Sequence, residues 1–181
     1  MRNRYSFSEF IKTLYSFVVT KITYPQARLI RRPIYIRGRY SATGLIGLTT
    51  GRFCRFDLDG KKKTLYIGEN CEIGDNVHIV AFNKVVIGDN VLAASKVFIS
   101  DTNHGSYKGE NISSHNTPPN KRELVKGETY IGNNVWIGEN VVILAGSKIG
   151  DGCVIGANTV VSTEIPPNSI VVGCNDVVRQ Y

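Results

Sequence analysis

Residues 131–161 read IGNNVWIGENVVILAGSKIGDGCVIGANTVV, and an aliphatic residue returns in them at every sixth position. A period of six fits neither an α-helix nor simple strand alternation, but it suits a short strand followed by a tight corner. Three such hexads would make one triangular coil, and stacked coils would make a solenoid. The aliphatic positions are Ile131, Ile137, Ile143, Ile149, Ile155 and Val161.

The same hexad extends upstream, with Ile67, Ile73 and Ile87 each followed by Gly, an acidic residue and Asn. Gly and Asn are expected to accept the strained dihedrals of the corners. The sequence therefore predicts an all-β solenoid over residues 34–181, beginning near Ile34 with weak hexads at Tyr40 and Ile46. Its core would be a stack of aliphatic rungs, with one internal column of Ile87, Ile131 and Ile149 and another of Ala93, Ile137 and Ile155.

Three breaks in the register predict excursions from the triangular path. Two are small: three extra residues around Lys61–Lys63 and two near Asn83. The third separates Ile99 from Ile131 and predicts a 26-residue insertion, residues 105–130, rich in Ser, Asn, Pro and charge. A long polar loop inside a compact solenoid is usually functional.

The basic residues are concentrated at the N-terminus of the 181-residue chain. Residues 1–40 hold nine Lys/Arg and one acid, a charge of +8, while residues 41–181 hold thirteen bases and fourteen acids, a charge of −1. A nearly neutral body argues against a nucleic-acid-binding core, whose folded surface would itself be basic. The four scattered cysteines indicate neither a zinc knot nor a disulfide scaffold, and they favour a reduced, cytoplasmic setting.

Residues 1–33 form a basic arm with a predicted amphipathic helix, capped by Ser6 and ended by Pro25. Charged residues within the apolar stretch exclude a spanning helix. The apolar stripe of this helix could lie on an anionic bilayer, or it could pack against the first coils or a trimer neighbour. Packing against protein is the favoured interpretation. The stripe consists of Phe7, Phe10, Ile11, Leu14, Phe17, Val18 and Ile22.

These hexads resemble those of the hexapeptide-repeat acyltransferases over roughly residues 34–178. The resemblance implies a left-handed parallel β-helix, against the usual crossover preference, acetyl-CoA as co-substrate, and a homotrimer with active sites between subunits. The insertion, running into Tyr130-Ile131-Gly132-Asn133-Asn134-Val135-Trp136, looks like the branch of the family that acts on bacterial surface polysaccharides.

His104 is the candidate catalytic residue. It ends the hexad that begins at Ile99 and directly precedes the insertion. Attack of a sugar hydroxyl on a thioester requires removal of the hydroxyl proton, and an imidazole does this well near neutral pH. In the acetyltransferases that the chain resembles, a His at this register is the general base. His78, within a regular hexad, and His115, inside the insertion, are expected to be structural or solvent-facing.

The coils after Trp136 resemble the coenzyme A groove of the family. The resemblance places donor contacts at Trp136, Gly138, Ala157 and Ser162, with Thr163 beside them and Arg179 near the nucleotide phosphates. The chain departs from the family at Thr163, which replaces a frequent Lys, and at Asn175, which replaces a Pro. The structural alternative for the small residues is ordinary corner packing. Acceptor contacts are expected at Asn83, Asn103 and Tyr107.

The resulting hypothesis is an acetyl-CoA-dependent O-acetyltransferase acting on a sugar hydroxyl of a surface polysaccharide or its precursor. Direct attack within a ternary complex needs no Ser, Thr or Cys nucleophile, and we expect no metal. An amino sugar or another small acceptor is an alternative. From other classes, a non-catalytic scaffold and a zinc carbonic anhydrase-like protein are the alternatives; the latter needs three His that converge on a metal across a subunit boundary, and the chain has three.

Overall fold

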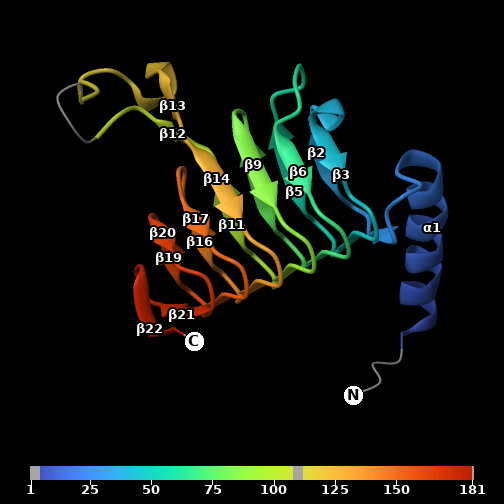
Figure 1. Cartoon of the computed structure of the whole chain (residues 1–181). Coiled ribbons are helices and arrows are strands. Elements are labelled where there is room, and N and C mark those ends of the chain that lie inside the picture. Colours follow the sequence, from blue (N-terminus) through green and yellow to red (C-terminus); the bar gives the residue numbers. More distant parts are fainter. Residues whose placement is uncertain (1–4, 108–111, 181) are drawn as a thin grey trace.

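A computed structural model describes residues 5–107 and 112–180, and it is a parallel β-helix with one helix at its N-terminal end (Figure 1). Three sheets form the faces of the prism, and successive strands pass from sheet A to sheet B to sheet C. This is the solenoid that the hexads predict, with the left-handed winding that the family resemblance implies. Sheet A consists of β1 (Leu29–Ile30), β4 (Thr49–Thr50), β7 (Glu72–Ile73), β10 (Leu92–Ala93), β15 (Trp136–Ile137), β18 (Val154–Ile155), β21 (Ser169–Val172) and the antiparallel β22 (Asp176–Gln180).

The other two faces carry six strands each. Sheet B consists of β2 (Tyr35–Arg37), β5 (Arg55–Leu58), β8 (His78–Ala81), β11 (Phe98–Ser100), β16 (Val142–Ile143) and β19 (Val160–Val161). Sheet C consists of β3 (Ala42–Gly44), β6 (Leu65–Ile67), β9 (Lys84–Ile87), β14 (Glu128–Ile131), β17 (Lys148–Ile149) and β20 (Glu164–Ile165). There are also two short 3₁₀ segments, Arg39–Ser41 and Pro119–Lys121.

The aliphatic columns are confirmed by the strand register. Ile131 pairs with Ile87 and Ile149, and Ile137 pairs with Ala93 and Ile155. All of these side chains are at most 3% exposed. The stacked rungs therefore form one continuous core.

The left-handed corner position is held by Asn, or by Gly as at Gly152 (φ 69°), as expected, but the Gly of each Ile-Gly pair has another role. The corner Asn residues adopt the left-handed conformation, as Asn134 (φ 55°) and Asn158 (φ 59°) do. The Gly of the Ile-Gly pair is needed for space instead: a Cβ on Gly138 would lie 2.6 Å from the backbone nitrogen of Ala157 in the next coil. The repeat thus requires Asn for the turn and Gly for the close stacking of coils.

The long insertion leaves the solenoid as an arm with two antiparallel strands, β12 (Thr102–His104) and β13 (Leu124–Lys126). The arm spans residues 102–127, because β14 already rejoins sheet C at Glu128. The insertion keeps its 26 residues but starts three residues earlier than expected. Counting hexads gives the length of an insertion, whereas strand pairing decides where it begins.

One expectation for the N-terminus is wrong, and of the two packing partners expected for its apolar stripe, the structure excludes one, the first coils. The solenoid starts before Ile34, because β1 at Leu29–Ile30 already pairs with β4 in sheet A; Arg31 and Arg32 follow it where the hexad would place Gly and a polar residue, which hides the repeat. Helix α1 (Phe7–Thr23) has the expected Ser6 cap, but its apolar stripe does not pack on the coils.

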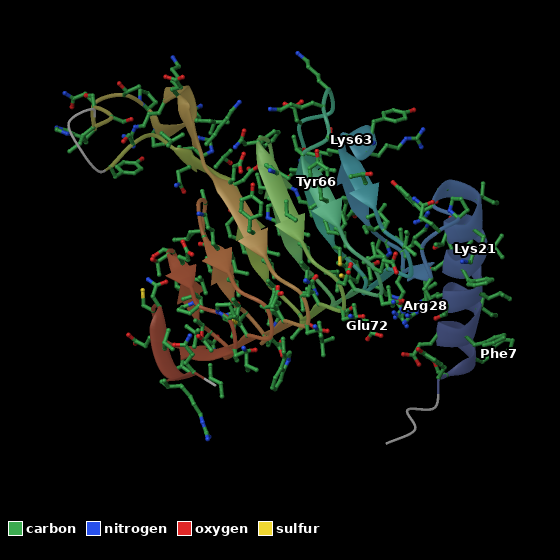
Figure 2. The ribbon with its side chains drawn as sticks, in the orientation of Figure 1. Phe7, Lys21, Arg28, Lys63, Tyr66 and Glu72 are labelled. Carbon is green, nitrogen blue, oxygen red and sulfur yellow. The ribbon has the colours of Figure 1, made fainter. Side chains whose placement is uncertain are left out.

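The face of α1 that meets the coils is polar. Ser16 and Thr20 are its buried residues, and their hydroxyls accept hydrogen bonds from the backbone nitrogens of Arg32 (3.1 Å) and Ile30 (2.9 Å). Phe7, which points away from the coils in Figure 2, is 79% exposed. Within the described ranges, no helix is both long enough and apolar enough to cross a membrane.

Candidate active site

His104 ends β12 at the base of the arm, and its side chain is exposed. The strand is paired with β13, which places Leu124 opposite His104. The Tyr107 hydroxyl donates to the His104 carbonyl oxygen, and Arg122 donates to that hydroxyl at 2.7 Å. Among the described residues, none forms a hydrogen bond with the imidazole. The backbone of His104 is therefore held, while its ring nitrogens stay available for chemistry.

A groove of about 550 Å³ separates the arm from the outer face of sheet B. One wall is the arm, with His104, and the opposite wall is charged. The floor is apolar. The lining consists of Arg37, Arg55, Asp57, Leu58, Val80, Phe82, Thr102, His104 and Leu124.

Asp57 is the centre of the charged wall. Its carboxylate accepts from Arg55 Nε at 2.7 Å, from Arg37 Nη1 at 3.1 Å and contacts His78 Nε2 at 3.1 Å. Burial alone would raise the pKa of Asp57, but the hydrogen bonds from His78 and Arg55 and the two guanidinium charges outweigh it. The pKa of this carboxyl is therefore below its ordinary value, and Asp57 is ionised at neutral pH.

Sequence reasoning missed this cluster, because Arg37, Arg55 and Asp57 belong to the irregular coils before Ile67. The register pairs Arg37 with Asp57 across β2 and β5 and pairs Arg55 with His78 across β5 and β8. The available signal was a set of charged residues at outward positions of consecutive coils. The cluster could be recognised only after each residue of the first coils had been assigned to an inward or outward position.

Asp101 ties the base of the arm to the corner at Asn83. Its buried carboxylate accepts from the backbone nitrogens of Phe82 (3.0 Å) and Asn83 (2.6 Å), and its carbonyl accepts from the Gly127 nitrogen (2.8 Å). Burial raises the pKa of Asp101 although backbone hydrogen bonds oppose the rise. Asp101 thus orients the arm, and with it His104, relative to sheet B.

The expected acceptor residues do not line the groove that contains His104. The Asn83 amide donates to the Gly127 carbonyl oxygen at 3.5 Å, and Asn103 and Tyr107 are exposed on the arm. The groove is lined by Phe82 and Thr102, the neighbours of Asn83 and Asn103. The acceptor role of Asn83, Asn103 and Tyr107 stays a prediction.

The expected donor residues lie in two separate places. Trp136 starts β15 on sheet A, Gly138 and Ala157 form corners between sheets A and B, and Arg179 lies on β22. Trp136 is 54% exposed. Ser162 and Thr163 instead follow β19, at the edge between sheets B and C from which the arm also leaves.

Asn175 accounts for one departure from the family pattern. It adopts φ 60° and accepts from the Ser162 backbone nitrogen at 2.7 Å, while its own amide donates to the Ser162 hydroxyl at 2.9 Å. Asn175 therefore holds the corner at Ser162 from the last turn of the chain.

The three His side chains do not converge. His78 is on sheet B against Asp57 and packs edge-on to Phe98, with ring centroids 5.3 Å apart. His104 is on the arm and His115 is exposed in the arm's loop. Across the described ranges, no group of three or more His, Cys, Asp or Glu is placed to hold a metal ion. This arrangement gives no support to the carbonic anhydrase alternative.

The chain belongs to the hexapeptide-repeat acetyltransferase family. Residues 128–163 match the family described as "Bacterial transferase hexapeptide (six repeats)". The chain is also 40% identical over 183 residues to the putative lipopolysaccharide biosynthesis O-acetyl transferase WbbJ of Escherichia coli strain K12, an alignment that covers 100% of this chain and 93% of WbbJ.

Two solved structures share the fold. AntD, an N-acyltransferase from Bacillus cereus in complex with coenzyme A and dTDP-4-amino-4,6-dideoxyglucose, is 18% identical with a TM-score of 0.70, covering 100% of this chain and 93% of AntD. A hexapeptide-repeat acetyltransferase of Vibrio cholerae, complexed with acetyl coenzyme A, is 27% identical with a TM-score of 0.60, covering 79% of this chain and 73% of that one.

Proposed function

We propose that the protein transfers acetyl from acetyl-CoA to a sugar hydroxyl of a bacterial surface polysaccharide or its precursor. The observation that carries the proposal is His104, which the arm places in the lining of a groove large enough for a sugar, with an imidazole that has no hydrogen-bond partner among the described residues. The full-length similarity to the O-acetyl transferase WbbJ supports a hydroxyl as the acetyl acceptor, and the acetyl coenzyme A complex of the Vibrio cholerae relative supports acetyl-CoA as the donor.

The reaction proceeds by direct attack. His104 takes the proton of the sugar hydroxyl as its oxygen bonds to the thioester carbonyl carbon, which gives a tetrahedral oxyanion and an imidazolium. Collapse of the intermediate breaks the carbon–sulfur bond, and the imidazolium returns its proton to the thiolate. The products are an acetyl ester and free coenzyme A, and the residue ends unchanged.

The division of the donor residues favours a homotrimer with active sites between subunits. Gly138 and Ala157 lie at a different edge of the prism from the edge that carries His104. Side-by-side packing of prisms brings the edge of one subunit against a different edge of its neighbour, as in a closed cyclic oligomer. Each site would then combine His104 of one subunit with Trp136, Gly138 and Ala157 of the next.

The predicted products test the reaction. Incubation of the purified protein with acetyl-CoA and bacterial surface glycans is expected to release free thiol and to add acetyl esters, read by mass and removed by mild alkali. Acetylation of an amino group would instead favour the amino-sugar alternative, because amides survive that treatment. If no glycan leads to release of free thiol, the proposed reaction is contradicted and the alternative function as a non-catalytic scaffold is favoured.

We also propose a cytoplasmic enzyme whose N-terminal helix α1 contacts the inner face of the membrane. The face of α1 opposite its buried Ser16 and Thr20 is apolar, and residues 1–40 carry a charge of +8. Both features suit an interfacial helix on an anionic bilayer. A neighbouring subunit fits this helix less well, because it would bring the same excess of positive charge.

Vesicle binding tests the contact. The protein is expected to sediment with phosphatidylglycerol vesicles, and Leu14→Glu should reduce binding about tenfold or more, because a carboxylate replaces an apolar side chain that is 51% exposed. Tyr66→Glu, on sheet C away from α1, is the matched control and should bind normally. A dissociated oligomer in Leu14→Glu would show that the face is a subunit contact instead.

A further inference from the structure

The charged wall of the His104 groove has more positive than negative charge. Arg37 and Arg55 share one carboxylate, that of Asp57, so the three side chains carry a net charge of +1. The Asp57 side chain is 13% exposed, whereas those of Arg37 and Arg55 are 67% and 46% exposed. Asp57 therefore positions the two guanidiniums and leaves them open to a ligand.

Donor groups remain on both guanidiniums. Arg55 uses its Nε toward Asp57, which leaves its two terminal nitrogens, and Arg37 uses Nη1. Among the described residues, neither side chain has an ion pair with another carboxylate. Two adjacent guanidiniums held by a buried carboxylate are well suited to bind the oxygens of a phosphate group.

The wall lies at a useful distance from the candidate base. β5, with Arg55, and β2, with Arg37, are two and three strands from β11 in sheet B. Strands are about 4.8 Å apart, so the two strands that carry Arg55 and Arg37 lie roughly 10 and 14 Å along the stack from the strand that leads to His104. This is the scale of a hexose with its attached phosphate or diphosphate.

Basic side chains continue from this groove toward the N-terminal helix. A second groove, of about 670 Å³, lies between α1 and the first coils. Lys12, Arg32 and Arg39 contribute positive charge there, and Tyr24, Ile34 and Ile36 contribute apolar surface. Strand β2 contributes to both grooves, with Ile36 in the second and Arg37 in the first.

We propose that the acceptor is a phosphate-linked sugar, whose phosphate binds Arg37 and Arg55 while its hydroxyl reaches His104. The inference rests on the proposed O-acetyl transfer and adds to it the chemical class of the acceptor. A soluble sugar phosphate, a nucleotide sugar and a sugar on a lipid diphosphate share this chemistry. The second groove and the exposed face of α1 favour the lipid form.

The phosphate site is tested first without catalysis. Inorganic pyrophosphate is titrated calorimetrically into protein saturated with coenzyme A, so that the donor site is occupied. Arg37→Gln and Arg55→Gln are each expected to weaken binding about tenfold, the size of a charge-assisted hydrogen bond. Lys63→Gln removes a cation from a nearby loop outside the groove and should bind like the wild type. Equal affinity in all four proteins overturns the site.

The acceptor class is tested by kinetics on matched sugars. Glucose, galactose and N-acetylglucosamine are compared as methyl glycosides, as 1-phosphates and as diphosphates of a short isoprenoid alcohol. The phosphorylated forms should have a kcat/KM about ten to a hundred times higher, and this advantage should shrink in Arg37→Gln and at high salt. Arg37→Lys should keep part of it, because charge survives without the planar fork.

The outcomes separate the two proposals. Methyl glycosides acetylated as fast as the phosphates would overturn the phosphate-linked acceptor and leave the acetyl transfer intact. Pyrophosphate binding that depends on Arg37 and Arg55, without acetylation of any sugar, would keep the anion site and overturn the reaction. Preference for the 1-phosphates over the isoprenoid diphosphates would assign a soluble acceptor.

Discussion

His104→Ala is expected to lower kcat by about a hundredfold to ten-thousandfold, the usual contribution of a general base. The KM values for acetyl-CoA and for the acceptor should change little, because His104 is the end of an exposed strand and not part of the solenoid core. Free thiol release with a saturating acceptor measures the loss. The midpoint of thermal unfolding should stay close to that of the wild type.

His115→Ala is the matched control. His115 is an exposed imidazole in the same arm, but it lies in the loop and does not line the groove. It should keep most of the wild-type activity. An active His104→Ala protein, or equal losses of activity in both variants, would contradict the role of His104 as general base.

The solenoid could be predicted from the hexads because its interactions are local and repetitive. Each inward aliphatic residue contacts its counterparts in the neighbouring coils, so the spacing between Ile131, Ile137 and Ile143 already contains the register. The same reasoning failed for Leu29 and Ile30, where the flanking arginines conceal the repeat. The periodicity predicted the type of the repeating element. The position of the first coil, in contrast, is set by the pairing of β1 with β4.

The candidate site was less predictable, because it is formed by residues that no local pattern connects. The position of His104 beside an insertion was readable from the register. Its surroundings were not: Asp57 lies nearly fifty residues earlier in the chain, and it reaches the same groove only through the stacking of β5, β8 and β11. The orientation of α1 depended on two hydroxyls, those of Ser16 and Thr20, bonding to the first coil.

Two inactive variants are expected to restore activity to each other if the site lies between subunits. His104→Ala removes the base, and Ala157→Trp fills the edge between sheets A and B with an indole on an exposed position, which blocks the donor without disturbing the core. Each homotrimer should be nearly inactive. Each site uses His104 of one subunit and Ala157 of the next subunit around the ring. When the two variants are mixed in equal amounts, a site is intact wherever a subunit that keeps His104 is followed by a subunit that keeps Ala157.

That combination arises in about a quarter of the sites of a randomly mixed cyclic trimer. Co-expression of the two variants with different affinity tags, followed by tandem purification, removes the homotrimers and leaves mixed trimers with one intact site of three, so it should yield roughly a third of the wild-type activity. A doubly substituted chain mixed with wild type is the control for exchange of subunits. Had the base and the donor edge acted within one chain, every mixed trimer would stay inactive, because each subunit would still lack one half of the site. The split of His104 from Gly138 and Ala157 across two edges of one prism is the reason to expect rescue.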